Sequence, residues 1–230
     1  MKKIFLIGDS IRMGYDTYVK ESMVNVAEVY YPSENCRFSG YVLRFVHAWK
    51  DALKIENVDV VHWNAGLWDT LRIYGDDMIV KPDVYADYID RIMRRLKFLF
   101  PGAKIIFATS TPVIEAGFIE EFEMRYNCDV EEYNRIACEI VTKHGGSIND
   151  LYTILKDVPE NYHSDQTHFY TADATELIGG QVNHVLCQAL EIDESKLIVP
   201  DKMKYHREKQ VGDKDMFIKR GDYWEKVLGI

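Results

Sequence analysis

The chain has 230 residues, of which 47% are hydrophobic and 28% are charged, as in an ordinary globular protein with a sizeable core. Its formal net charge of -9 argues against a general binder of nucleic acids or anionic membranes. The four cysteines form no C-x-x-C pair, so they predict neither a disulfide framework nor a zinc site.

Short apolar segments alternate with amphipathic ones along the chain. The apolar segments predict five strands, over residues 4–7, 26–31, 58–63, 104–109 and 147–151. The amphipathic segments predict five helices, over residues 10–24, 40–53, 82–100, 129–144 and 171–190. This alternation predicts an α/β fold, a three-layer α/β/α sandwich around about five parallel strands with the polar fifth strand at an edge. The long connections over 64–81 and 110–127 are expected to shape a pocket.

The two ends of the chain carry separate predictions. The first apolar run stops after four residues, too few for a signal peptide, and no later run reaches the roughly 18 apolar residues of a membrane helix. We therefore expect a cytoplasmic protein with no membrane partner. We divide the chain into a domain over 1–195 and a C-terminal extension over 196–230. That extension could brace the domain, cover the active-site edge or reach a partner subunit in a homo-oligomer.

Unusual polar residues follow the predicted strands. Ser10, in Gly8-Asp9-Ser10, would present a hydroxyl at the carboxyl edge of the sheet, although a serine there is often only a helix cap. Asp165 and His168 stand three residues apart, just before the last helix. A serine, a histidine with its own carboxylate and spare amide donors are what acyl transfer to a serine requires.

In these motifs the chain resembles the SGNH hydrolases, the GDSL-type esterases with a flavodoxin-like sandwich. Gly8-Asp9-Ser10 resembles the nucleophile block, Ser39-Gly40 the glycine block and Asp165-Gln166-Thr167-His168 the D-x-x-H block. The resemblance implies that Ser10 is the nucleophile, His168 the general base and Asp165 its orienting carboxylate. It also implies that the backbone amides of Ser10 and Gly40 line an oxyanion hole.

The third block departs from the family pattern. The usual G-x-N-D has asparagine before the aspartate, whereas Gly66-Leu67-Trp68-Asp69 has tryptophan there. Related members with an N-x-G pattern suggest that Asn64 supplies the side-chain oxyanion donor; the alternative is that Asn64 only ends a strand or caps a turn. Asp69 is expected to hold the loop rather than to catalyse.

Other polar and aromatic residues carry competing interpretations. Arg37 and Trp68 are candidate substrate-binding residues, with a solvated arginine and a packed tryptophan as the alternatives. Trp63 and Phe169 could join Trp68 in a wall around the substrate or could pack in the core. Asp9 could be a phosphoryl-accepting aspartate or a hydrogen-bond partner of the neighbouring backbone, and His62 could be a base or a core histidine. His163, two residues before Asp165, could line the site.

We expect a serine esterase that hydrolyses a small polar ester, with O-acetyl groups of a carbohydrate as the first choice by family resemblance. The expected mechanism needs neither metal nor cofactor. The alternatives are a lipid-type acylhydrolase or thioesterase and a non-catalytic carbohydrate-binding pseudoenzyme. A flavodoxin-like nucleotide-binding domain is disfavoured, because no G-x-G-x-x-G or Walker loop follows any strand.

Overall fold

The structure, a computed structural model, describes residues 1–207. Its central sheet has five strands in the order β2-β1-β3-β5-β7, and every neighbouring pair is parallel. In that order the strands span Ala27–Tyr30, Lys2–Ile7, Val60–Trp63, Lys104–Ala108 and Ser147–Asn149. The predicted parallel sheet is confirmed, and so is the position of the short fifth strand at an edge.

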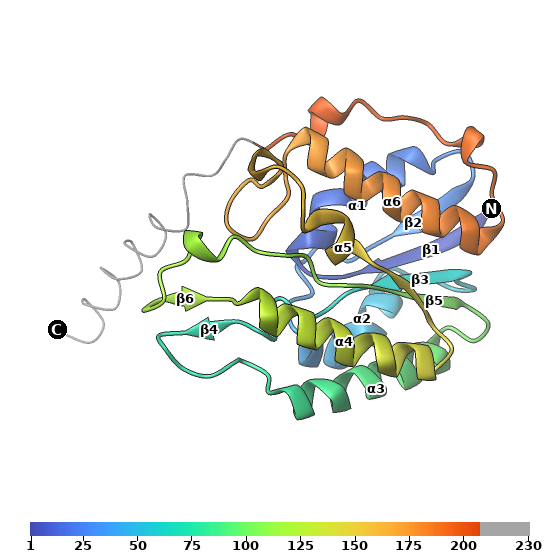
Figure 1. The fold of residues 1–230 in the computed structure, drawn as a ribbon. Coiled ribbons are helices and arrows are strands. Elements are labelled where there is room, and N and C mark those ends of the chain that lie inside the picture. The colour runs from blue at the N-terminus through green and yellow to red at the C-terminus, as the bar shows by residue number, and fades with distance from the viewer. Residues whose placement is uncertain (208–230) are drawn as a thin grey trace.

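Helices cover both faces of this sheet (Figure 1). Helices α1 (Ser10–Ser22) and α6 (Ala172–Leu190) pack on one face. Helices α2 (Ser39–Ala52), α3 (Pro82–Leu99) and α4 (Asn127–Lys143) pack on the other. The three-layer sandwich is therefore confirmed, with the strand order of the flavodoxin-like class.

The sheet separates two apolar clusters, and alternate side chains of each strand belong to one cluster or the other. Ile4 and Leu6 of β1 lie in the apolar cluster under α1 and α6, whereas Phe5 and Ile7 lie in the cluster under α2, α3 and α4. All four side chains are fully buried. Successive side chains of a strand point to opposite faces, so an uninterrupted apolar run fits a strand covered on both sides.

The irregular segments contain short elements that the sequence patterns missed. Within the two long connections, β4 (Arg72–Ile73) and β6 (Glu123–Met124) pair antiparallel into a second, small sheet. A short helix, α5 (Leu151–Leu155), follows β7 and is capped by the Asp150 side chain. Single-turn helices add η1 (Glu115–Gly117), η2 (Glu160–Tyr162), η3 (Glu194–Lys196) and η4 (Lys202–Tyr205). Elements of two to five residues are too short for a period of 2 or 3.6 to be recognised.

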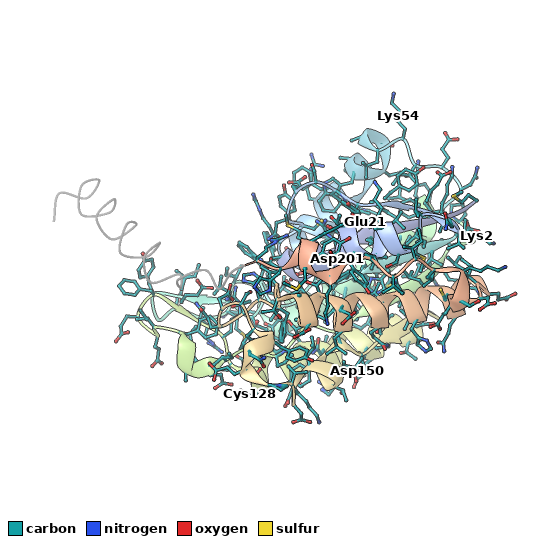
Figure 2. All side chains as sticks on the ribbon, turned by 90° about the horizontal axis from the view of Figure 1, so that it is seen from above. Lys2, Glu21, Lys54, Cys128, Asp150 and Asp201 are labelled. Carbon is teal, nitrogen blue, oxygen red and sulfur yellow. The ribbon has the colours of Figure 1, made fainter. Side chains whose placement is uncertain are left out.

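The first part of the predicted extension lies against the sandwich. η4 contacts α1 and α6, where Lys202 pairs with Asp173 and Glu176, and Lys204 approaches Glu21. Figure 2 shows Asp201, which precedes η4, on the side of the molecule where α1 and α6 lie. Residues 208–230 lie outside the described residues, so the boundary at residue 195 stays a prediction. Among the helices that the structure describes, none combines the length and the apolar character needed to cross a bilayer.

Candidate active site

Ser10 begins α1 directly beyond the carboxyl end of β1. The helix cap is Asp9, whose extended backbone precedes the helix and whose side chain accepts a hydrogen bond from the Ile11 N–H at 2.9 Å. The interpretation of Ser10 as a cap is therefore wrong, because its neighbour has that role. Since Asp9 caps the helix through the Ile11 N–H, the Ser10 hydroxyl is not needed as a cap and is available for other contacts.

Ser10, His168 and Asp165 form one hydrogen-bonded series. The Ser10 Oγ lies 2.7 Å from the His168 Nε2, and the His168 Nδ1 lies 2.7 Å from the Asp165 Oδ2. Residues 158 positions apart in the chain meet here because β1 and the loop before α6 end at the same edge of the sheet. A carboxylate bonded to one imidazole nitrogen leaves the other nitrogen to accept the hydroxyl proton.

The Asp165 carboxylate is fixed by its own loop. Its Oδ1 accepts hydrogen bonds from the backbone N–H groups of Thr167 and His168, each at 2.7 Å. Burial favours a higher pKa for Asp165, but the His168 ring and these two donors outweigh it and hold the pKa below the ordinary value. Asp165 is therefore ionised at neutral pH and oriented to accept from the imidazole.

The loop after β2 brings Gly40 to the same region. The Cys36 N–H donates to the Gly8 carbonyl at 3.1 Å, so this loop lies against the turn that carries Ser10. Gly40 is in the first turn of α2, where backbone N–H groups have no acceptor within the helix. A Cβ at Gly40 would lie 2.7 Å from the Phe38 ring and 3.0 Å from the Tyr88 ring, so this position has little room for a side chain.

Asp69 joins the loops that follow β2 and β3. Its carboxylate accepts from the Ser39 N–H, at 3.1 Å to each oxygen, and from the Ser39 hydroxyl. Burial raises the pKa of Asp69 to about 7. These contacts give Asp69 the loop-holding role expected from the sequence.

Asn64 follows the last residue of β3, adjacent to the Ser10 turn. Its N–H donates to the Ile7 carbonyl at 3.0 Å, and its buried side chain lies against Gly8. Among residues 1–207, the Asn64 Oδ1 has no hydrogen-bond partner. Burial raises the pKa of the neighbouring Asp9, and the Asn64 amide is among the groups that oppose this rise.

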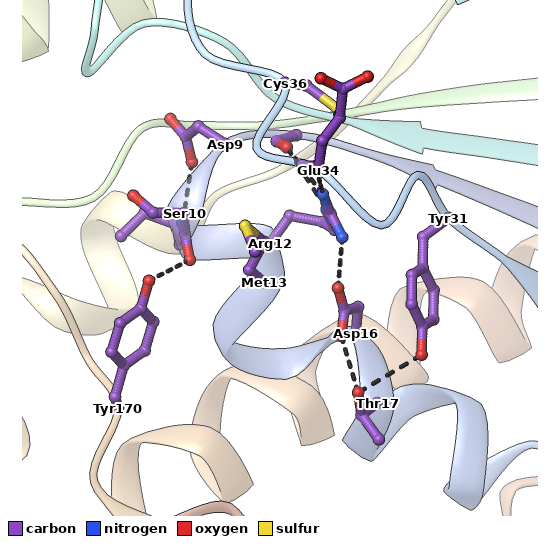
Figure 3. A network of polar contacts seen from close by, with 12 residues as sticks. Asp9, Ser10, Arg12, Met13, Asp16, Thr17, Tyr31, Glu34, Cys36 and Tyr170 are labelled. Carbon is purple, nitrogen blue, oxygen red and sulfur yellow. Dashed lines mark hydrogen bonds and ion pairs between the residues drawn. The ribbon is translucent and has the colours of Figure 1, made fainter. Parts of the chain in front are cut away.

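Arg12 is a buried residue that the sequence interpretation missed. Its guanidinium bonds to the Glu34 carbonyl at 2.6 Å, to the Gly8 carbonyl at 3.3 Å and to the Asp16 carboxylate (Figure 3). It therefore links the Ser10 turn, the loop after β2 and α1. The i,i+4 spacing to Asp16 resembles that of many exposed helix pairs, so the sequence offered no sign that this pair is buried.

The two candidate substrate-binding residues differ in exposure. Arg37 is exposed, adopts the left-handed conformation with φ 53°, and places its guanidinium carbon 4.8 Å from the centroid of the Tyr41 ring. Trp68 is half-buried in the loop after β3, next to Asp69. Neither is shown to face a substrate, so both roles stay predictions.

Four other candidates pack in or against the core. Trp63 and Phe169 are fully buried, so their proposed part in a substrate wall is wrong. His62 is buried on the sheet, its Nε2 lies 3.1 Å from the Asn149 Nδ2, and burial lowers its pKa to about 4. It is a neutral core histidine, as the structural alternative held. His163 packs its ring against Phe169, with centroids 4.0 Å apart.

Within residues 1–207, no three His, Cys, Asp or Glu side chains are placed to hold a metal ion.

The fold has clear relatives among solved structures, whereas the sequence matches no protein-family model and no curated protein. A lipase/acylhydrolase from Enterococcus faecalis is similar at 18% identity and a TM-score of 0.65, over 87% of this chain and 100% of that chain. An acetyl xylan esterase, AlAXEase, is similar at 17% identity and a TM-score of 0.62, over 80% and 99%. A carbohydrate acetylesterase family member from Sinorhizobium meliloti is similar at 16% identity and a TM-score of 0.61, over 84% and 100%.

This chain therefore has the fold of GDSL-like lipases and esterases. At these identities the likeness concerns the fold, and what the chain does has to be argued from its own site.

Proposed function

We propose that this protein is a serine esterase that acts through an acyl-enzyme on Ser10. The observation that carries the proposal is the series Ser10–His168–Asp165, with 2.7 Å at each of its two contacts. A core-packing or capping role would not require a serine hydroxyl, an imidazole and an ionised carboxylate to be joined in this order.

The proposed reaction has two steps. The Ser10 Oγ attacks the ester carbonyl while the His168 Nε2 takes its proton, and Asp165 stabilises the imidazolium. Collapse of the tetrahedral intermediate breaks the bond to the alcohol, which leaves with the proton from His168. Water then attacks the acyl-Ser10 by the same route, giving the acid and the free hydroxyl.

The oxyanion would be held by three donors. We assign the backbone N–H groups of Ser10 and Gly40, both at helix N-termini where the dipole favours negative charge, and the side-chain amide of Asn64. Asn64 fits this role because it is buried beside the Ser10 turn. It takes the place of the asparagine that the third block lacks.

The substrate we propose is a small polar ester, first of all an O-acetyl group on a carbohydrate. Two structures with this fold are described as an acetyl xylan esterase and a carbohydrate acetylesterase family member, which supports the choice by analogy. Arg37 and Trp68 would contact the sugar, through the guanidinium and the indole face respectively.

A lipid-type acylhydrolase is the second candidate. One similar structure is described as a lipase/acylhydrolase, and the segment around β4 exposes Ile73, Tyr74 and Ile79. An exposed apolar surface of this kind would suit a longer acyl chain.

The test is hydrolysis of acetylated sugars and of nitrophenyl esters from C2 to C12 by the wild type and by Ser10→Ala. We expect activity that is highest for acetyl esters and lost in Ser10→Ala. A rate that rises with chain length would favour the lipid-type alternative. Hydrolysis that survives in Ser10→Ala would overturn the assignment of the nucleophile, and an inert wild type would favour a pseudoenzyme.

A further inference from the structure

Tyr170 is not part of the Ser10–His168–Asp165 series, but it contacts both Ser10 and His168. Its ring stacks on the His168 imidazole, with centroids 4.8 Å apart and planes 19° from parallel. Its hydroxyl donates to the Ser10 carbonyl oxygen at 2.8 Å (Figure 3). Burial raises the pKa of Tyr170 well above its ordinary value, so the hydroxyl stays a donor at working pH.

Arg207, in the C-terminal extension, holds Tyr170 in place. The Arg207 guanidinium carbon lies 4.3 Å from the centroid of the Tyr170 ring, and the Arg207 N–H donates to the Tyr170 carbonyl at 2.9 Å. Arg207 also donates to the Met13 carbonyl on α1 at 3.3 Å. Two residues after Tyr170, the Ala172 N–H at the start of α6 donates to the His206 Nδ1 at 3.2 Å.

Helix α1 bounds the ring from another side. A Cβ at Gly14 would lie 2.9 Å from both Cδ1 and Cε1 of Tyr170. A real Cβ does not come so close, and the ring is held by its hydroxyl, the imidazole and the guanidinium. The absence of a side chain at Gly14 therefore lets the ring lie where it meets His168.

From these contacts we infer that Tyr170 is a positioning residue, braced by Arg207 of the C-terminal extension. By stacking on the His168 imidazole it fixes the orientation of that ring, so that the Nε2 faces the Ser10 hydroxyl. This inference rests on the proposed function, because it concerns the same base and nucleophile. It adds a role for the C-terminal extension, because Arg207 acts on the site through Tyr170.

Three full-length variants disturb the ring by different routes. Tyr170→Leu removes the stack and the hydroxyl, Gly14→Ala pushes the ring from α1, and Arg207→Gln removes the cation. Tyr170→Phe is the conservative variant, since it keeps the ring. Gly180→Ala, on α6 with nothing within 4 Å of the added Cβ, is the matched glycine control. Arg91→Gln is the matched arginine control, because Arg91 lies 5.9 Å from the Tyr88 ring on α3.

The kinetic readout separates positioning from a loss of structure. We expect Tyr170→Leu and Gly14→Ala to lower kcat by roughly ten- to a hundred-fold with KM nearly unchanged, the cost of misplacing a catalytic group. Arg207→Gln should lower kcat less, Tyr170→Phe should retain most of it, and both controls should match the wild type. Unchanged kcat in folded Tyr170→Leu and Gly14→Ala would overturn the inference.

A second readout needs no turnover. The His168 Cε1–H resonance, assigned by its loss in His168→Gln, reports the ring current of Tyr170. It should move in Tyr170→Leu and Gly14→Ala and stay in place in Tyr170→Phe and Gly180→Ala. If the wild type proved inert but this pattern held, the proposed function would fail while the positioning contact stood. A resonance that does not respond in Tyr170→Leu would contradict the inference even in an active enzyme.

Discussion

The Asn64 side chain lies against Gly8, in the place that a side chain at Gly8 would fill, between the ends of β1 and β3. A Cβ carbon at Gly8 would lie 1.9 Å from the Asn64 Oδ1 and 2.7 Å from the Arg12 Cβ. The glycine of Gly8-Asp9-Ser10 is thus required by close packing, since its φ is not in the left-handed region. It allows the Asn64 side chain to reach the turn that carries the proposed nucleophile.

Gly8→Ala should therefore reduce both stability and activity. Overpacking of this kind typically costs about 1–3 kcal/mol of the free energy of unfolding. Urea unfolding and ester hydrolysis measure the two effects, with Gly180→Ala as the matched control. Adding Asn64→Ala should recover part of the stability, because it removes the closest clash. Wild-type stability in Gly8→Ala would show that the two residues do not share this space.

Asn64→Ala tests the third oxyanion donor. Loss of one such donor lowers kcat on the order of a hundred- to a thousand-fold. Ser10 should still form an acyl-enzyme slowly, and KM should change little. Asn64→Asp, which keeps the shape but not the NH₂ group, should be similarly impaired. If either variant keeps kcat within a few-fold of the wild type, the donor is another group.

Arg12→Met tests the buried cation that ties the Ser10 turn to the loop after β2. Removing one partner of a buried pair leaves Asp16 without its counter-ion and should cost roughly 3–5 kcal/mol of the free energy of unfolding. The control is Arg91→Met, which breaks an exposed i,i+4 pair with Asp87 and should cost at most about 1 kcal/mol. Equal losses in the two variants would mean that burial of Arg12 does not matter energetically.

Asp69 gives a pH-dependent prediction. Burial raises its pKa to about 7, whereas an aspartate of the unfolded chain titrates near pH ~4. The folded state therefore binds more protons than the unfolded state in this window, and the free energy of unfolding falls as the pH rises through it. Asparagine can still accept from Ser39 but carries no charge.

We expect the stability gained in Asp69→Asn to be near zero at pH 4 and to grow toward pH 8, to at most about 4 kcal/mol. Urea unfolding of both proteins across this range measures the difference. His62, whose pKa burial lowers to about 4, gives a slope of the opposite sign, but it is common to both proteins and cancels. A difference that does not depend on pH would show that Asp69 is not buried as a titrating acid.

The parts of the fold that follow from periodicity were predictable. The run Ile4–Ile7 and the helix beginning at Pro82 showed their patterns in the sequence, and the parallel sheet followed from their alternation. The pairing of β4 with β6 was not predictable, because two-residue strands carry no period and their partners lie in separate loops. The same holds for α5, which depends on its cap at Asp150.

The site was predictable where a motif marked it and not where packing made it. Ser10, Asp165 and His168 were predicted from short blocks, and the structure joins them in one hydrogen-bonded series. Arg12 and Tyr170 belong to no such block, and their importance lies in burial and in contacts with distant carbonyls, rings and residue 207. A single sequence does not reveal which arginine or tyrosine becomes buried beside a site.

The most direct test of the central claim is reaction of the full-length protein with a fluorophosphonate, read by mass spectrometry of the intact chain and of its peptides. An activated serine displaces fluoride and becomes phosphonylated on its Oγ. We predict one phosphonyl group per chain, located on Ser10 in the wild type and absent from Ser10→Ala. An unlabelled wild type, or a label on another residue that persists in Ser10→Ala, would contradict the account.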